Sequence, residues 1–165
     1  MMMSATSRPP PPLPRATYVL LLLDADNGAP IRGRTRLEKL IFLVQMRIVD
    51  GLKVGVTQES YRFRPFHYGP YTEEVLDDLM ALQMLGLVSI VGDDEAQQTF
   101  AITPRGHEAV QRLVQEARVT SVLVDEIRKI KATFGRMNLD QLVQRVYTDY
   151  PQYTEKSHIK DRYLY

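Results

Sequence analysis

Four carboxylates lie within six residues of one another, at Glu73, Glu74, Asp77 and Asp78. On a helix this spacing puts Glu73 beside Asp77 and Glu74 beside Asp78, because residues four apart are neighbours on its surface. Paired carboxylates catalyse acid–base reactions only where a dry pocket raises the pKa of one of them. A solvated helix face is the commoner arrangement of such charges, and it suits a basic protein partner. We therefore predict a protein-binding surface at these four residues.

Basic residues are concentrated just before these carboxylates. Residues 32–64 contain eight Lys or Arg and three Asp or Glu, whereas residues 65–104 contain seven acids and no Lys or Arg. Because Lys and Arg neutralise phosphates, the basic segment is the candidate for nucleic-acid binding. Two ordinary solvated faces would give the same charge layout, and that alternative stays open. The candidate nucleic-acid-binding residues are Arg32, Arg34, Arg36, Lys39, Arg62 and Arg64.

The sequence contains few residues that could bind a metal or act as a nucleophile. There is no cysteine, which leaves no thiolate nucleophile or ligand, and the three histidines His67, His107 and His158 are far apart. A metal site needs several such ligands to converge, so we predict no metal, no cofactor and no enzyme activity. Residues 33–36 could hold one anion at a helix start, although a plain capped turn explains them as well. An enzyme that uses His67 with the acidic face is the weakest hypothesis.

The element that must position the carboxylates is a helix. Pro70 suits its first position, and Gly86 ends it. Apolar residues at three- and four-residue steps give its buried stripe: Val75, Leu76, Leu79, Leu82 and Leu85. We expect His67 to fix the turn before this helix by a hydrogen bond. The residues of this structural turn are His67, Tyr68, Gly69, Pro70 and Tyr71.

A β-hairpin follows this helix, with strands at residues 87–91 and 98–102 across a turn at Gly92, Asp93 and Asp94. Upstream, a helix spans residues 16–26, with Tyr18, Val19, Leu22 and Leu23 as its packing face. A second helix is capped by Thr35 with Glu38 in a capping box and stops at residues 50–51. It buries Leu37, Leu40, Ile41, Val44 and Ile48, with Arg36, Lys39 and Arg47 away from that stripe.

Three more helices are predicted after the hairpin. Thr103 and Pro104 begin one that runs to residue 118, a second spans residues 119–134, and Asn138 with Gln141 caps a third that ends before Pro151. Their buried faces include Ala109, Val110, Leu113 and Val114, then Val122, Leu123, Ile127, Ile130 and Phe134, and finally Leu139, Leu142, Val143, Val146 and Tyr147.

This order of elements predicts a mainly α fold with a small β-hairpin wing (α+β). We assign a disordered Pro-rich tail to residues 1–15, a winged helix-turn-helix core to residues 16–103 and a C-terminal helical extension to residues 104–165. The two core helices are usually joined by three or four residues, whereas about twenty separate them here. The apolar run at residues 19–23 is too short to span a bilayer, and no signal-sequence cleavage site follows it. We expect a cytoplasmic protein without membrane contact.

The fold alone would suggest DNA binding, since the last core helix of a winged helix normally enters the major groove. Carboxylates on that helix would oppose the phosphates. A non-enzymatic interaction or regulatory protein that binds a protein partner or a second copy of itself is therefore our first hypothesis. The alternative is a DNA-binding transcriptional regulator that uses the basic residues between Arg32 and Arg64. No small-molecule substrate is inferred.

Four segments also resemble a known family: RTRLEKLIFLVQ, FRPFHYGPYTEEVLDDLMALQMLGLV, FAITPRG and VYTDYPQY. In this order they resemble the YwgA-like prokaryotic proteins, which are small winged-helix proteins related more distantly to the SocA-like antitoxin (Panacea) group. The resemblance covers roughly residues 31–153, and the HYGPY turn with the acidic helix is its most specific part. It implies a winged-helix fold and no established reaction. By analogy with the antitoxins it suggests a protein-binding or genetic-conflict role.

Overall fold

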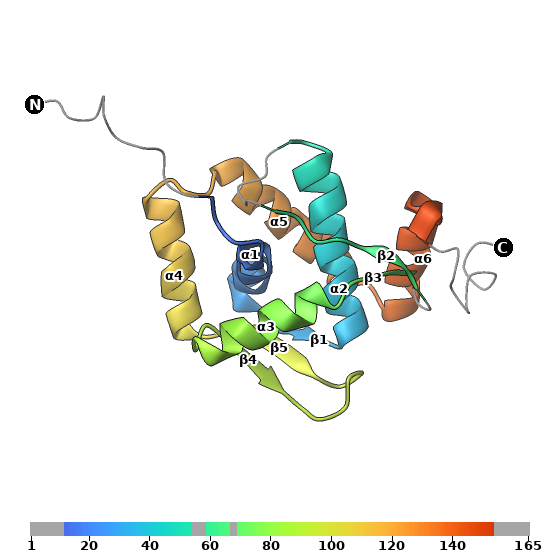
Figure 1. Ribbon diagram of the computed structural model, residues 1–165, viewed down its shortest axis with the longest axis horizontal. Helices are drawn as coiled ribbons and strands as arrows, with labels where there is room; N and C mark the ends of the chain where they lie inside the picture. The colour runs from blue at the N-terminus through green and yellow to red at the C-terminus, as the bar shows by residue number, and fades with distance from the viewer. Residues whose placement is uncertain (1–11, 54–58, 67–68, 154–165) are drawn as a thin grey trace, which may run out of the picture.

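A computed structural model describes residues 12–53, 59–66 and 69–153 of the chain (Figure 1). The protein is mainly helical with a small antiparallel sheet. None of the described helices is both long and apolar enough to cross a membrane. The elements are α1 (Ala16–Gly28), β1 (Ile31–Arg32), α2 (Arg34–Leu43), the π-helix η2 (Val44–Asp50), β2 (Arg64–Phe66), β3 (Gly69–Tyr71), α3 (Glu74–Met84), β4 (Val88–Val91), β5 (Thr99–Ile102), α4 (Pro104–Gln115), α5 (Ser121–Phe134), α6 (Leu139–Asp149) and the 3₁₀ turn η3 (Pro151–Tyr153).

Helix α1 is the centre of the fold. Figure 1 shows it end-on, with α4, α5, α2 and α3 around it. Every residue from Thr17 to Leu23 is buried, so this helix is apolar on all sides, as a central helix must be. The predicted packing face, Tyr18, Val19, Leu22 and Leu23, is confirmed but incomplete, because Leu20 and Leu21 are buried as well.

The end of the predicted tail belongs to the fold. Leu13 is only 6% exposed and joins the hydrophobic core, and Arg15 forms ion pairs with α3. The predicted disorder is therefore wrong for Leu13 and Arg15. Residues 1–11 lie outside the described part of the chain.

Helix α2 starts two residues earlier than predicted and without the expected capping box. Its first residue is Arg34, and Gly33 precedes it with φ 93° and no side-chain cap. Backbone N–H groups at a helix start need acceptors, and here the loop after β4 supplies them. Gly33 N donates to Gln98 O (2.7 Å) and Arg34 N donates to Glu95 O (3.2 Å). The box predicted at Thr35 and Glu38 is wrong because a distant loop already provides two acceptors.

The sheet has the strand order β1-β5-β4, with Ile31 opposite Phe100 and Val88 opposite Ile102. The predicted hairpin is thereby confirmed as β4 and β5. It projects beyond the helices at the lower edge of Figure 1. Phe100, in the central strand, is fully buried.

Helix α3 begins four residues later than predicted. Residues Gly69–Tyr71 form β3 and pair with β2, so that Pro70 lies opposite Pro65. Neither proline can donate an N–H, and an antiparallel pair has non-hydrogen-bonded positions that accept such residues. Pro70 is thus a strand residue, and Glu74 opens the helix with its N–H on Thr72 Oγ1 (3.2 Å).

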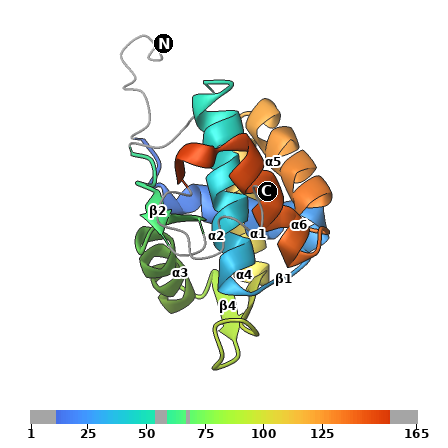
Figure 2. The same ribbon diagram turned by 90° about the vertical axis from the view of Figure 1, so that its right-hand side faces the viewer.

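The three C-terminal helices pack onto the other elements. Leu123, Ile127 and Val146 share one hydrophobic core with α1 and α2, and Figure 2 shows α5 and α6 on the side of α2 away from α3. The caps at Thr103 and Asn138 are confirmed, the latter as a full capping box. Burial of the edge residues was predicted wrongly: the exposed fractions are 59% for Leu85, 48% for Val114, 51% for Val122 and 41% for Leu139.

Candidate functional site

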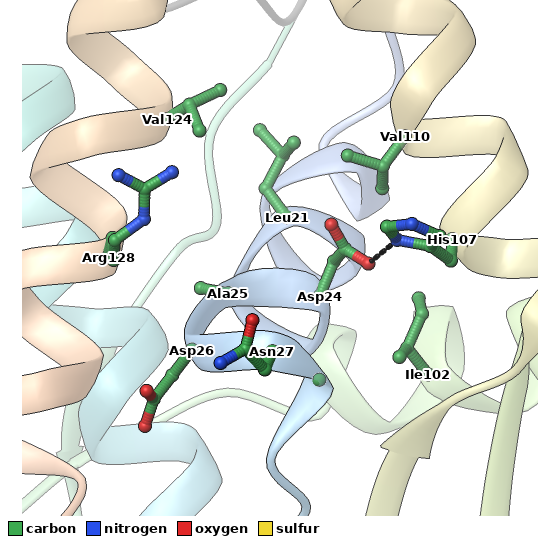
Figure 3. A pocket seen from close by; sticks show the side chains of 11 residues that line it. Leu21, Asp24, Ala25, Asp26, Asn27, Ile102, His107, Val110, Val124 and Arg128 are labelled. Atoms are coloured by element: carbon green, nitrogen blue, oxygen red, sulfur yellow. Dashed lines mark hydrogen bonds and ion pairs between the residues drawn. The ribbon is translucent and has the colours of Figure 1, made fainter.

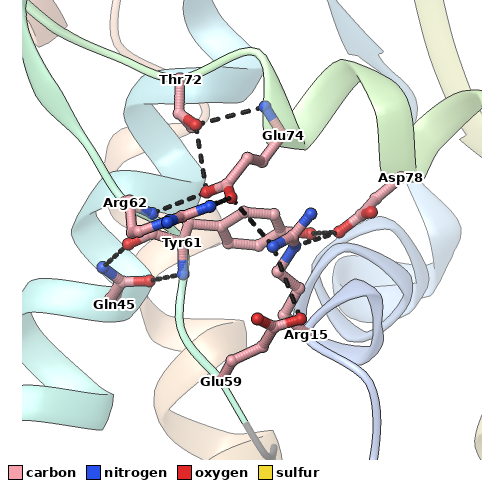
Figure 4. Close-up of polar contacts among 8 residues, drawn as sticks. All are labelled: Arg15, Gln45, Glu59, Tyr61, Arg62, Thr72, Glu74 and Asp78. Atoms are coloured by element: carbon pink, nitrogen blue, oxygen red, sulfur yellow. Dashed lines mark hydrogen bonds and ion pairs between the residues drawn. The ribbon is translucent and has the colours of Figure 1, made fainter.

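Arg15 lies among the carboxylates of α3 (Figure 4). Its Nε donates to Asp78 Oδ2 at 2.9 Å, and its Nη1 donates to Glu74 Oε2 at 3.0 Å. The hydroxyl of Tyr61 donates to the same Asp78 oxygen at 2.7 Å. The hydrogen bond to Asp78 raises the pKa of Arg15, although burial alone would lower it. Burial, followed by the hydrogen bond to Asp78, raises the pKa of Tyr61. The arginine therefore stays charged, and the tyrosine stays a donor.

A second arginine holds Glu74 from the opposite side. The backbone N of Arg62 donates to Glu74 Oε1 (2.8 Å), and its Nη2 donates to Oε2 (2.9 Å). Burial would raise the pKa of Glu74, but the Arg62 hydrogen bonds and the charges of Arg15 and Arg62 together lower it. Gln45 fixes this strand segment by exchanging two hydrogen bonds with the backbone of Tyr61 (2.6 and 2.7 Å).

The predicted acidic and basic surfaces therefore neutralise each other over much of their extent. Arg64 Nη2 lies 2.6 Å from Glu73 Oε1, and this pair is exposed. Glu74 and Asp78 are only half-buried, but both are occupied by arginines. The expectation of a solvated acidic face is wrong for these two residues. Asp77 is exposed and has no ion pair within the described part of the chain.

The other basic candidates also have internal partners. Arg32 donates to Gln97, and Arg34 donates to Gln98 (2.8 Å) and Glu95 (2.9 Å). These contacts tie the basic segment to the hairpin loop rather than leaving it free.

Arg36 and Lys39 bind backbone carbonyls. Arg36 Nη1 donates to Met137 O (2.6 Å) and Gly135 O (3.3 Å) at the end of α5. Lys39 is only 2% exposed, and its Nζ donates to Pro70 O (3.0 Å). Lys39 was expected on the outer side of its helix, and that prediction is wrong because the β2–β3 hairpin covers this side.

The structural turn is described in part. His67 and Tyr68 lie outside the described residues, so the hydrogen bond predicted for His67 remains a prediction. Gly69 has φ 95°, and a Cβ there would come within 2.7 Å of Tyr147 Cε1. Glycine is therefore required on both conformational and steric grounds, and this close approach joins the turn to α6.

The outer face of α3 is apolar where it is not acidic. Met80 is 54% exposed, Met84 89% and Leu85 59%. Asp77, Met80 and Met84 follow one another at three- and four-residue steps, so they share one face of the helix. Exposed methionine is unusual on a free surface and enriched where proteins meet.

A cavity of about 440 Å³ lies between the end of α1, α4 and α5 (Figure 3). His107 Nδ1 lies 2.6 Å from Asp24 Oδ1 at its wall. A carboxylate and an imidazole are two of the three members of a catalytic triad. The described residues that line the cavity include no Ser, Thr or Cys. The pair therefore links α1 to α4 without an adjacent nucleophile.

Among the described residues, no three His, Asp or Glu side chains come together as a metal site. His158, like His67, lies outside those residues. Sequence reasoning missed Arg15, Tyr61 and Gln45, whose contacts join distant segments and leave no local signal. Glu38 was interpreted only as a cap, yet it lines a second cavity.

No family model matches the chain, and a comparison with curated proteins returns no match either. The resemblance to the YwgA-like proteins therefore stays a prediction.

Proposed function

We propose that the chain is a winged-helix protein that binds a protein partner and performs no catalysis. The proposed fold is supported by the order α1, β1, α2, α3, β4, β5 and by the placement of β1 beside β5. The long insertion before α3 ends in the β2–β3 hairpin, which takes the place of a tight turn. The interaction would take place in the cytoplasm, a compartment that suits a chain without cysteine.

The observation that supports this function best is the outer face of α3. On the helix that would enter DNA in a typical winged helix, this face presents Asp77, Met80 and Met84. A carboxylate repels phosphate, whereas methionine side chains adapt to the surface of a protein partner. The proposed partner-binding surface is therefore this face of α3, next to Leu85, and not the full set of four carboxylates. A partner with an apolar patch and a basic rim fits it, as does a second copy of the chain through its exposed arginines.

The test is a double variant, Asp77→Lys with Met84→Glu, that touches none of the hydrogen bonds of Glu74 and Asp78. We expect it to fold normally by circular dichroism and to lose partner capture in a cross-linked pull-down from cells of the source organism. Self-association is measured in parallel by sedimentation. The control, Val122→Glu with Asp125→Lys, introduces the same two side chains at exposed positions of α5 and removes only an exposed ion pair with Arg128. Capture and self-association that are equal in all three proteins would contradict the proposal.

A DNA-binding regulator is the second candidate. One observation favours it: among the described residues that line a cavity of about 400 Å³, four are basic and one, Asp26, is acidic. The basic residues are Arg32, Arg36, Lys131 and Arg136. Such a cluster could hold a backbone phosphate. Arg36 and Lys131 already bind helix-terminal carbonyls, which gives the cluster a structural role as well.

Duplex binding measured by fluorescence anisotropy tests this candidate. We expect affinity to fall steeply with salt, and the Arg32→Ala/Arg136→Ala variant to weaken binding and reduce the salt slope by about two. The absence of any binding at low salt would remove this candidate. An antitoxin-like role remains a proposal that rests on the family resemblance.

A further inference from the structure

A second cavity, of about 270 Å³, lies between the start of α2, the β2–β3 hairpin, α3 and the loop after β4. Its lining includes Thr35, Glu38, Lys39, Phe66 and Tyr71. The hydrogen-bonded cluster of Arg15, Tyr61, Arg62, Glu74 and Asp78 contributes no residue to its lining. Ligand cavities for drug-sized molecules start at about 300 Å³, so this one suits a single ring system.

Glu38 is the unusual group in this cavity. Within the described part of the chain its carboxylate has neither a hydrogen bond nor an ion pair, although it is half-buried. Burial raises its pKa to about 7, against the nearby charges of Lys39 and Arg34. A polar group removed from water without a partner costs free energy. A ligand with adjacent hydrogen-bond donors would remove that cost.

Lys39 supplies donors beside this acceptor. Its ammonium has three N–H groups, and Pro70 O accepts one of them at 3.0 Å. Burial lowers the pKa of Lys39 to about 8. The cavity thus places an acceptor and a donor of opposite charge next to each other.

The charges at the rim are already paired. Arg34 and Glu95, which both line the cavity, form an ion pair of 2.9 Å. With Glu38 and Lys39 of opposite sign inside, the site as a whole favours neither a cation nor an anion. A neutral ligand that carries both donors and an acceptor fits it better.

Two aromatic residues of the β2–β3 hairpin contribute to the lining of the cavity. The rings of Phe66 and Tyr71 are stacked, with centroids 4.9 Å apart and an interplanar angle of 27°. Both residues line the cavity. Planar heterocycles, nucleobases above all, stack on such side chains.

We propose that this cavity binds a guanine base. The Watson–Crick edge of guanine carries two adjacent donors, N1–H and the 2-amino group, next to the O6 acceptor. A carboxylate accepts both donors at once, and Lys donors are common partners of O6. Glu38 would therefore bind N1 and N2, Lys39 would bind O6, and the ring would lie against Phe66 or Tyr71. Adenine, cytosine and uracil lack two adjacent donors on this edge. The inference is independent of the proposed partner surface on α3.

Isothermal titration of the full chain at pH 8 with guanosine, inosine and adenosine tests this assignment. Inosine lacks only the 2-amino group. We expect guanosine to bind about tenfold or more tightly than either analogue, because a site built to pair polar groups discriminates against their loss. Arginine amide is the probe for a cation.

Two variants complete the experiment. Glu38→Gln is expected to weaken guanosine binding about tenfold or more, since the amide accepts at one atom only. Phe66→Leu, which keeps the polar groups, should weaken all bound bases alike. The control Glu108→Gln changes an exposed carboxylate on α4 and should leave binding unchanged. Equal binding of the three nucleosides, no saturable binding of guanosine, preference for arginine amide, or unchanged binding in a folded Glu38→Gln variant would overturn the proposal.

Discussion

The Nε atom of Arg15 lies 2.9 Å from Oδ2 of Asp78, across 63 residues of sequence. This contact joins the segment before α1 to the middle of α3. The guanidinium also binds Glu74 and lies 5.2 Å from the centre of the Tyr61 ring, and the Tyr61 hydroxyl donates to Asp78, so this cluster connects three segments of the chain. The carboxylates that the sequence offers as a binding surface thus serve largely to fix α3 in place.

Arg15→Ala should destabilise the fold by about 1–3 kcal/mol, because it removes the arginine that binds the half-buried Asp78 and one of the two arginines that bind Glu74. Urea unfolding followed by circular dichroism measures this free energy. Arg128→Ala is the matched control, since its ion pair with Asp125 is exposed on both sides and such pairs contribute about 0–1 kcal/mol. An equal decrease in the free energy of unfolding of the two variants would show that the Arg15 cluster stabilises the fold no more than an exposed ion pair does.

Much of the local structure was predictable from the sequence, and the failures share one cause. The hairpin β4–β5 and the caps at Thr103 and Asn138 depend on neighbouring residues, and all three are confirmed. Lys39 and Pro70 were misplaced because the β2–β3 hairpin covers α2, a contact between segments about thirty residues apart.

The candidate site was predictable only as a set of residues. Residue types and spacing found the carboxylates and the arginines, but not that Arg62 binds Glu74 and Arg64 binds Glu73. Charge pairing between a loop and a helix depends on the path of the chain. The exposed methionines of α3 also gave no signal, because a methionine in a helix is more often buried.

Glu38 should make stability depend on pH in an unusual direction. Its pKa in the folded protein is raised from 4.5 to about 7, so the folded state binds more protons than the unfolded state between these values. Stability therefore falls as pH rises from about 4.5 to about 7. Glu38→Gln should remove this component, so the unfolding free energy of the wild type should fall relative to that of the variant from about pH 5 to about pH 7.5. Parallel pH profiles would contradict it.

Lys131 should act in the alkaline range. Burial lowers its folded-state pKa from 10.5 to about 8, despite Asp26 and Asp24. The unfolded state then binds more protons between pH 8 and 10.5, so this residue makes stability rise across that window. Lys131→Met should abolish the rise. It should also cost about 1–3 kcal/mol at pH 7, because Leu23 O and Ala25 O lose their donor. Thermal unfolding at pH 7, 8 and 10 measures both effects, and a variant with an unchanged alkaline rise would refute the assignment.

Gly69→Ala separates steric from conformational strain at the turn. A Cβ at Gly69 meets Tyr147 Cε1 at 2.7 Å, and φ is 95°. Gly86 has a similar φ of 77°, but its nearest neighbour is the flexible side chain of Arg105 at 3.7 Å. Gly86→Ala should therefore cost about 1–2 kcal/mol from backbone strain alone, whereas Gly69→Ala adds an overpacking cost of about 1–3 kcal/mol.

Urea unfolding of both variants, with Gly69→Ala/Tyr147→Leu as the relief variant, measures the two contributions. Removing the ring should make the alanine at position 69 less harmful than it is in the Tyr147 background. If the changes in unfolding free energy of the two single substitutions simply add in the double variant, residue 69 of β3 does not clash with Tyr147 of α6. In that case the β2–β3 hairpin would need another contact to hold it over Lys39.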